Sequence, residues 1–225
     1  RSDMVYKTCV SIAEKTPKKI SKSLSKALKK SDHAEIRFDF LNHESIPETL
    51  DMIKKDLKKC ICTLRPSSEG GKFSGTEKNR ISIIKLIAEY NPFLLDIEFN
   101  TIKKNKNLLR YLKSTNTDLL VSWHNFKQTP NISILKKQYL KMKKISNNIK
   151  IVTTAKTVND VPKILSLYDN KNTRLIAFCM GDIGKISRLL SLFLGSPFTY
   201  VSLGKPIAAG QLKLDEVKSM LMRSG

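Results

Sequence analysis

The feature that most constrains the fold of this 225-residue chain is a regular alternation of short apolar runs with lysine-rich amphipathic stretches. Short β-branched or apolar runs predict strands, whereas apolar positions three and four residues apart predict helices. The interval between neighbouring runs matches the ~30 residues of a strand–helix–strand unit. Eight strands are expected, at Val5–Ser11, Ala34–Phe40, Cys60–Leu64, Leu94–Phe99, Leu119–Trp123, Lys150–Thr154, Leu175–Met180 and Thr199–Leu203.

Helical stripes follow these runs, so the pattern predicts a single α/β domain over residues 1–225, a (β/α)8 or TIM barrel. No low-complexity linker divides the chain, and the Pro66–Gly71 segment is expected to be a loop within the repeat. The expected buried stripes are Ile20, Leu24, Ala27 and Leu28; Ile83, Ile84 and Ile87; Leu135, Tyr139 and Met142; Val161, Ile164, Leu165 and Tyr168; Ile186, Leu189, Leu190 and Phe193; and Leu214, Val217 and Leu221.

Nothing in the sequence indicates a membrane protein. There is no run of about eighteen apolar residues and no apolar segment of signal-peptide form near the start, so a soluble cytoplasmic protein is expected. Met4 is expected to mark the natural start, with Arg1, Ser2 and Asp3 left over from cloning.

The cysteines and histidines do not indicate a metal site. Cys9, Cys60, Cys62 and Cys179 lie in or beside apolar runs, where a thiol usually behaves as a small buried hydrophobe. Cys60 and Cys62 lack a second ligand pair, and the three histidines show no ligand spacing. Neither metal nor cofactor is expected.

The net charge of +21 raises the question of nucleic-acid binding, because basic surfaces neutralise phosphates. The lysines, however, are spread over most of the expected helices and form no stripe with interleaved aromatic residues. Solvated helix faces that also attract anionic metabolites are the favoured explanation, and dedicated nucleic-acid binding is the less favoured one.

Polar residues gather near the expected strand ends, where barrel enzymes place their active sites. Glu35, Arg37 and Asp39 alternate along the second strand, and a Glu35–Arg37 pair would offset part of the cost of burying them. A solvent-facing strand remains the alternative. Arg65 begins a glycine-containing loop after the third strand.

The fourth strand carries a similar acidic pair, Asp96 and Glu98, expected on one face. His124 lies just past the fifth strand, where it is either an acid–base group or a structural histidine. Lys150 opens the sixth strand. Aimed inward, it would lose hydration and become a nucleophilic amine; aimed outward, it would reach solvent.

Seven motifs, in order along nearly the whole chain, together resemble the type I 3-dehydroquinate dehydratases. One such motif is unspecific, whereas their order and spacing on eight strand–helix units are specific. The motifs are Glu35-Ile36-Arg37-Phe38-Asp39; Thr63-Leu64-Arg65 with Glu69-Gly70-Gly71; Asp96-Ile97-Glu98; Ser122-Trp123-His124-Asn125-Phe126 with Thr129-Pro130; Lys150-Ile151; Met180-Gly181 with Gly184 and Ser187-Arg188; and Gly195-Ser196 with Ala208-Ala209-Gly210-Gln211.

The resemblance implies dehydration of 3-dehydroquinate to 3-dehydroshikimate in the shikimate pathway of aromatic amino acid biosynthesis, without metal or cofactor. Lys150 would form a Schiff base with the ketone, His124 would transfer protons, and Glu69 would orient His124. The implied substrate-binding residues are Arg188 and Gln211 at the carboxylate, Glu35, Arg37 and Arg65 at the ring hydroxyls, Met180 and Tyr200 on the apolar faces, and Ser11 as a further polar contact.

Three positions depart from the family pattern. Ile207 stands where a serine is common, Ala209 where a proline is common and Tyr200 where a phenylalanine is expected. The contacts of the last loop are therefore expected to differ. The short N-terminus also predicts that a hairpin plugging the barrel in longer relatives is missing, and the relatives suggest a homodimer.

The sequence leaves two alternatives. Another Schiff-base barrel lyase, such as a class I aldolase, would share a strand-borne lysine but leaves His124 and the Glu69-Gly70-Gly71 loop unexplained. A nucleic-acid-binding protein would account for the charge, and it predicts a steep loss of binding with added salt.

Overall fold

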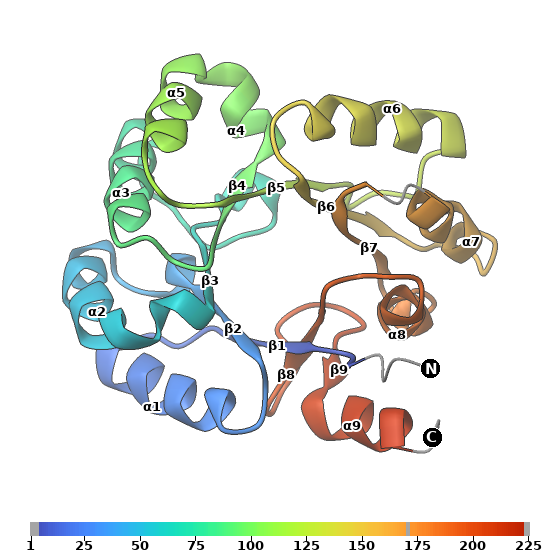
Figure 1. The fold of residues 1–225 in the computed structure, drawn as a ribbon, viewed down its shortest axis with the longest axis horizontal. Coiled ribbons are helices and arrows are strands. Elements are labelled where there is room, and N and C mark those ends of the chain that lie inside the picture. Colours follow the sequence, from blue (N-terminus) through green and yellow to red (C-terminus); the bar gives the residue numbers. More distant parts are fainter. Residues whose placement is uncertain (1–4, 170–171, 223–225) are drawn as a thin grey trace. The chain divides into compact units, whose positions relative to one another are not determined.

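The predicted alternation of strands and helices is present in the computed structural model, which describes residues 5–169 and 172–222 (Figure 1). All eight predicted strands are found, and a short ninth strand was not predicted. The strands are β1 (Thr8–Ile12), β2 (His33–Arg37), β3 (Cys60–Thr63), β4 (Leu94–Glu98), β5 (Leu119–His124), β6 (Asn148–Thr154), β7 (Arg174–Met180), β8 (Thr199–Ser202) and β9 (Leu212–Lys213).

Helices follow the strands, with short 3-10 turns between some elements. The helices are α1 (Pro17–Leu28), α2 (Ile46–Ile53), α3 (Glu77–Glu89), α4 (Phe99–Lys104), α5 (Lys106–Ser114), α6 (Ile132–Lys143), α7 (Asp160–Leu165), α8 (Lys185–Phe193) and α9 (Leu214–Met222). The 3-10 turns are η1 (Phe38–Phe40), η2 (His43–Ser45), η3 (Lys54–Lys59), η4 (Ser67–Glu69) and η5 (Ser166–Asp169).

Several helices begin where a polar side chain caps the first turn. The Thr16 hydroxyl accepts from the Lys19 amide at 3.3 Å at the start of α1, and Thr76 does the same for α3 at 3.1 Å. The Asn131 side chain caps α6 through the Ile134 amide at 3.1 Å. These contacts satisfy amide groups that the first turn leaves without helical partners.

The chain forms two compact units, residues 11–122 and residues 1–10 with 123–225. The prediction of a single domain stays a prediction. In the unit of residues 11–122, β2, β3, β4 and β5 are parallel neighbours. Their register places Thr63 beside Asp96 and Glu98 beside Ser122, so polar side chains collect at the carboxyl ends of these strands.

In the other unit, β6 pairs with β7 and β8 lies between β1 and β9, all in parallel. Lys150 is opposite Ile176 and Thr154 is opposite Met180. The four cysteines are free and fully buried, as expected for small hydrophobes. Burial raises the pKa of the Cys60 thiol to about 12, which keeps it protonated near neutral pH.

The buried stripe predicted for α8 is wrong. Ile186 is 51% exposed and Phe193 is 39% exposed, whereas the buried side chains are Ser187, Arg188, Ser191 and Leu192. The polar face turns inward because the Ser187 hydroxyl accepts from the Cys179 amide at 2.8 Å at the end of β7. This rotation buries Arg188.

Within residues 5–169 and 172–222, no helix has the length and apolar character needed to cross a membrane.

Candidate active site

Lys150 is buried in the interior of strand β6. The prediction that Lys150 opens this strand is wrong, because β6 begins two residues earlier, at Asn148. Only 6% of Lys150 is exposed, and its Nζ lies 4.2 Å from the centre of the Tyr200 ring, over the ring face. The electron-rich face of an aromatic ring stabilises a positive charge above it.

Arg188 lies over a second aromatic ring. Its guanidinium carbon is 4.3 Å from the centre of the Phe178 ring, and the centres of the Phe178 and Tyr200 rings are 6.4 Å apart. Arg188 is 2% exposed and forms no ion pair with any residue in the described part of the chain. Burial lowers its pKa to about 10. A buried guanidinium without a carboxylate partner is suited to an anionic ligand.

The loop between β8 and β9, called the last loop here, contacts Arg188 through backbone groups. Arg188 Nη2 donates to the Ala209 carbonyl at 3.1 Å, and the Gly181 amide donates to the same oxygen at 3.2 Å. Gly210 has a φ of +76°, and a Cβ there would lie 2.4 Å from the Gly181 carbonyl oxygen. Gln211 is buried, and its side-chain oxygen accepts from the Ile207 amide at 2.8 Å. Ile207 thus contributes its backbone to the loop.

His124 is half-buried at the end of β5 and is followed by a segment tied to β6. The Asn125 amide donates to the Val152 carbonyl at 2.8 Å, and the Thr154 hydroxyl donates to the Asn125 carbonyl at 3.0 Å. The His124 ring stacks on Phe126 at a centroid distance of 5.6 Å. These contacts fix the backbone beside the histidine relative to the strand that bears Lys150. Met180, half-buried at the end of β7, is in the same unit.

In the unit of residues 11–122, Glu35 is buried and accepts two hydroxyl hydrogen bonds. Ser11 donates to one carboxylate oxygen at 3.1 Å and Thr63 to the other at 2.8 Å. The predicted Glu35–Arg37 pair is therefore wrong. Hydroxyl donors satisfy Glu35 instead.

Arg37 pairs with Asp39. Its Nε and Nη2 donate to the two Asp39 oxygens at 2.9 and 2.8 Å. The prediction that Asp39 lies on the second strand is wrong, because β2 ends at Arg37 and the chain turns through η1. This turn brings the carboxylate back to the guanidinium, where it also accepts from the Lys72 amide at 3.0 Å.

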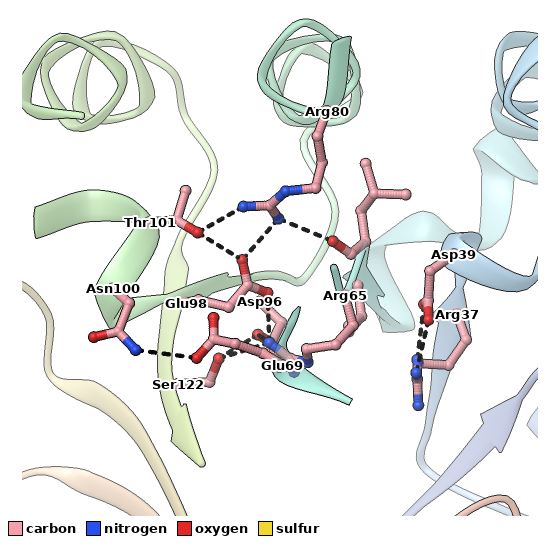
Figure 2. A network of polar contacts seen from close by, with 12 residues as sticks. Arg37, Asp39, Arg65, Glu69, Arg80, Asp96, Glu98, Asn100, Thr101 and Ser122 are labelled. Carbon is pink, nitrogen blue, oxygen red and sulfur yellow. Dashed lines mark hydrogen bonds and ion pairs between the residues drawn. The ribbon is translucent and has the colours of Figure 1, made fainter. Parts of the chain in front are cut away.

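Arg65 lies in a buried ion-pair network at the ends of β3 and β4 (Figure 2). Its Nη1 and Nη2 bind both oxygens of Asp96 at 2.9 and 2.8 Å, and Nη1 also donates to Glu98 at 2.5 Å and to Ser122 at 3.0 Å. Burial lowers the pKa of Arg65, but Asp96 and Glu98 more than offset this effect and raise it well above its usual value. The acidic pair predicted on one face of the fourth strand is confirmed, and both carboxylates are buried.

Glu69 ends the 3-10 turn after Arg65 and accepts from the side-chain Nδ2 of Asn100 at 3.2 Å (Figure 2). Gly70 has a φ of +78°, and a Cβ at Gly71 would lie 2.1 Å from the Arg65 carbonyl oxygen. Both positions therefore require glycine, which explains the Glu-Gly-Gly sequence. Burial and the charge of Glu98 raise the pKa of Glu69.

Two residues that contact these charged groups, Phe178 beside Arg188 and Arg80 beside Glu98, were not predicted from the sequence. Phe178 lies two residues before Met180 on β7, and residues two apart on a strand share a face. Arg80 precedes Ile84 and Ile87 by four and seven residues, which places it on the buried stripe of α3. An arginine on an apolar stripe was the available signal.

The described residues contain eight strand–helix units, a buried strand lysine and a buried arginine with no carboxylate partner among them, which are features of an α/β protein of the (β/α)8 class. A family model described as Type I 3-dehydroquinase matches residues 8–225. A 3-dehydroquinate dehydratase from Dehalococcoides mccartyi is 38% identical over 200 residues, 86% of this chain and 87% of that protein. The chain belongs to the type I 3-dehydroquinase family, and the enzyme class predicted from the sequence is confirmed at that level.

Solved structures share the fold. The 3-dehydroquinate dehydratase of Geobacillus kaustophilus aligns with a TM-score of 0.88 at 22% identity, over 97% of this chain and 91% of that chain. The 3-dehydroquinate dehydratase of Aquifex aeolicus aligns with a TM-score of 0.79 at 29% identity, over 96% and 97% of the two chains. The predicted fold class is confirmed.

Proposed function

We propose that the chain dehydrates 3-dehydroquinate to 3-dehydroshikimate in the shikimate pathway, through an imine on Lys150. The observation that carries the proposal is the pair of buried cations on aromatic rings. Lys150 lies over Tyr200 and Arg188 over Phe178, with the ring centres 6.4 Å apart. A keto acid has two groups that such a pair recognises, an electrophilic carbonyl and a carboxylate.

The first step is attack by the neutral Lys150 amine on the C3 ketone. The carbinolamine then loses the ketone oxygen as water and leaves a protonated imine. This cation draws electrons from the neighbouring C2–H bond and makes the C2 proton removable. The Tyr200 ring face, beside Nζ in the free enzyme, would stabilise the positive charge that develops there.

His124 is the proposed acid–base residue. It takes the C2 proton, and the resulting enamine expels the C1 hydroxyl, which leaves as water with a proton returned by His124. Hydrolysis of the conjugated imine releases the enone and restores Lys150. The attachment of the neighbouring Asn125 to β6 supports a fixed position for the histidine backbone. The role of Glu69 in orienting His124 stays a prediction from the family resemblance.

The substrate carboxylate is assigned to Arg188 and Gln211. The buried guanidinium of Arg188, which has no carboxylate partner among the described residues, supports this role. The Gln211 side chain is held in place by its hydrogen bond from the Ile207 amide. For the ring hydroxyls we propose Glu35, Arg37 and Arg65, with Ser11 as the weaker polar contact. Met180 is proposed to pack, with Tyr200, on the apolar faces. The paired carboxylates and guanidiniums of residues 11–122 support hydrogen bonding to neutral hydroxyls, because their net charge is small.

The test is borohydride reduction in the presence of 3-dehydroquinate, followed by peptide mass spectrometry. We expect one adduct, on Lys150, formed in parallel with loss of activity. Lys150→Ala should form no adduct and lose at least ~10⁴-fold in kcat. Lys136→Ala, at an exposed lysine of α6, is the matched control and should behave as the unmodified enzyme. An active enzyme with its adduct at another lysine would overturn the proposal.

The acid–base role has its own measurement. His124→Ala should still be trapped as an imine while turnover falls by ~10²–10⁴-fold, because proton transfer and not imine formation is impaired. Near-normal turnover would remove His124 from the mechanism.

The homodimer and the cytoplasmic location stay predictions. Light scattering of the purified protein would test whether it is a dimer.

A further inference from the structure

Arg80 lies on the buried side of helix α3 and is 1% exposed. Its side chain reaches the ends of two strands. All five of its N–H donors are used. The acceptors are both oxygens of Glu77 at 2.9 and 2.8 Å, the Leu64 carbonyl at 3.0 Å, one oxygen of Glu98 at 2.8 Å and the Thr101 hydroxyl at 2.6 Å. A saturated guanidinium of this kind has one orientation.

Glu98 joins Arg80 to Arg65 (Figure 2). One Glu98 oxygen accepts from Arg80, and the other accepts from Arg65 Nη1 at 2.5 Å. The Glu98 side chain has no exposed surface, so its orientation is set by these two guanidiniums and by Thr101, which donates to it at 3.1 Å. A change at Arg80 is therefore transmitted to Arg65 through one carboxylate.

A second connection runs through the backbone. Leu64, whose carbonyl Arg80 binds, directly precedes Arg65. The Arg65 carbonyl accepts from the Phe73 amide at 3.2 Å and closes the loop that bears Glu69. Arg80 thus holds both the carboxylate that pairs with Arg65 and the backbone from which Arg65 and Glu69 project.

We propose that Arg80 is a positioning residue that fixes Arg65 through Glu98 and Leu64 and balances the charge of Glu98 near Glu69. The inference rests on the proposed function, which gives Arg65 and Glu69 their roles. Arg80 itself acts through its neighbours and touches no reacting atom.

The charges around Glu69 make the proposal testable by sign. Burial raises the pKa of Glu69 most, Glu98 raises it further, and Arg65, the Asn100 hydrogen bond and Arg80 lower it. Removing the charge of Arg80 should raise the pKa of Glu69, whereas removing the charge of Glu98 should lower it. Loss of packing alone would not shift the pKa of Glu69 in opposite directions in the two variants.

The experiment compares Arg80→Met, Arg80→Lys and Glu98→Gln with Arg110→Lys, a control at an exposed arginine of α5. Glu69 is titrated by NMR with ¹³C-labelled glutamate, its signal identified with Glu69→Gln. The value of kcat/KM is measured as a function of pH and is normalised to the concentration of active sites, which is counted by borohydride trapping on Lys150. We expect Glu69 to titrate at higher pH in Arg80→Met and at lower pH in Glu98→Gln, with the acid limb of kcat/KM following.

Arg80→Lys separates charge from geometry, because it keeps the charge and loses the fork. It should leave the titration of Glu69 nearly unchanged but lower kcat/KM about tenfold, since small displacements of positioned groups cost ~10–100-fold. Should Arg80→Met not fold, Arg80→Lys and Glu98→Gln decide the question. Glu69 titration shifts of one sign in both charge variants, or an Arg80→Lys profile equal to that of Arg110→Lys, would overturn the proposal. Absence of any Lys150 adduct in the unmodified enzyme would instead overturn the proposed function.

Discussion

The two units hold their buried cations in different ways. In residues 11–122, each of the buried or half-buried guanidiniums of Arg37, Arg65 and Arg80 forms an ion pair with a carboxylate. In the other unit, Arg188 lies on the Phe178 ring and has no carboxylate partner among the described residues. The first arrangement satisfies a charge within the protein, whereas the second leaves a charge for a ligand.

The pKa directions express the same difference. Burial lowers the pKa of every buried arginine, but Asp96 and Glu98 reverse this effect at Arg65, whose pKa is raised well above its usual value. At Arg188 burial prevails, with a small opposing effect of Cys179, and the pKa falls to about 10. A cation that is costly to bury and unpaired is expected at a site shaped for binding and not for stability.

The largest expected effect is on activity, at Arg188. Arg188→Met should lower kcat/KM by ~10²-fold or more, because removing one partner of a buried charge pair costs ~2–5 kcal/mol. Thermal stability should be kept or raised, since an unpaired buried cation is removed. Steady-state kinetics and calorimetry on the same preparation check both. Preserved activity with a marked loss of stability would erase the contrast between the units.

At Arg65 the effect on stability should be the largest. Arg65→Met leaves Asp96 and Glu98 buried without their main donor, and breaking a buried pair costs ~3–5 kcal/mol. Urea unfolding measures the loss, and Arg110→Met at an exposed position should change it by less than ~0.5 kcal/mol. Adding Glu98→Gln should recover part of the loss. A stability equal to that of the control would show that the network does not hold this unit.

A smaller loss is expected at Arg37. Its side chain is 15% exposed, and Asp39 keeps the hydrogen bond from the Lys72 amide when the guanidinium is removed. Arg37→Met should therefore cost only about 1.5–3 kcal/mol of unfolding free energy, the value of hydrogen bonds to a charged group. Urea unfolding beside Arg65→Met ranks the two. A cost above that of Arg65→Met would reverse the order that burial predicts.

The smallest effect concerns Glu69 and pH. Its pKa is raised by burial and by Glu98, so its contribution to stability is present below the ordinary glutamate pKa and is lost as pH rises through the raised value. Glu69→Gln removes that loss. Its melting temperature should exceed that of the unmodified enzyme near neutral pH by less than ~3 °C and match it in acid. A gain that grows on acidification would contradict the sign.

The strands were predictable because their side chains alternate over short runs, and this local pattern needs no knowledge of partners. The orientation of α8 was not. Its apolar positions predicted burial of Ile186 and Phe193, but the contact of Ser187 with the Cys179 backbone turns the polar face inward. A hydrogen bond between residues on two elements outweighs a weak stripe, and periodicity alone does not contain it.

The partners of the charged residues show the same limit. Asp96 and Glu98 were predicted on one side of β4, and the parallel register places Thr63 beside Asp96, which brings Arg65 to them. Asp39, in contrast, was expected on the strand, and only the turn at η1 returns it to Arg37. Alternation predicts faces, whereas the pairing of charges depends on where the backbone turns.

The bridging position of Glu98 has a consequence for how this region can change. Each of its oxygens is committed to a different guanidinium, so a neutral residue at 80 leaves a half-satisfied buried carboxylate, and an apolar residue at 98 leaves two guanidiniums each short of an acceptor. Positions 65, 80 and 98 are therefore expected to be inherited as a set. Engineering that aims to redesign the ion-pair network around Arg65 should exchange all three together or leave all three alone.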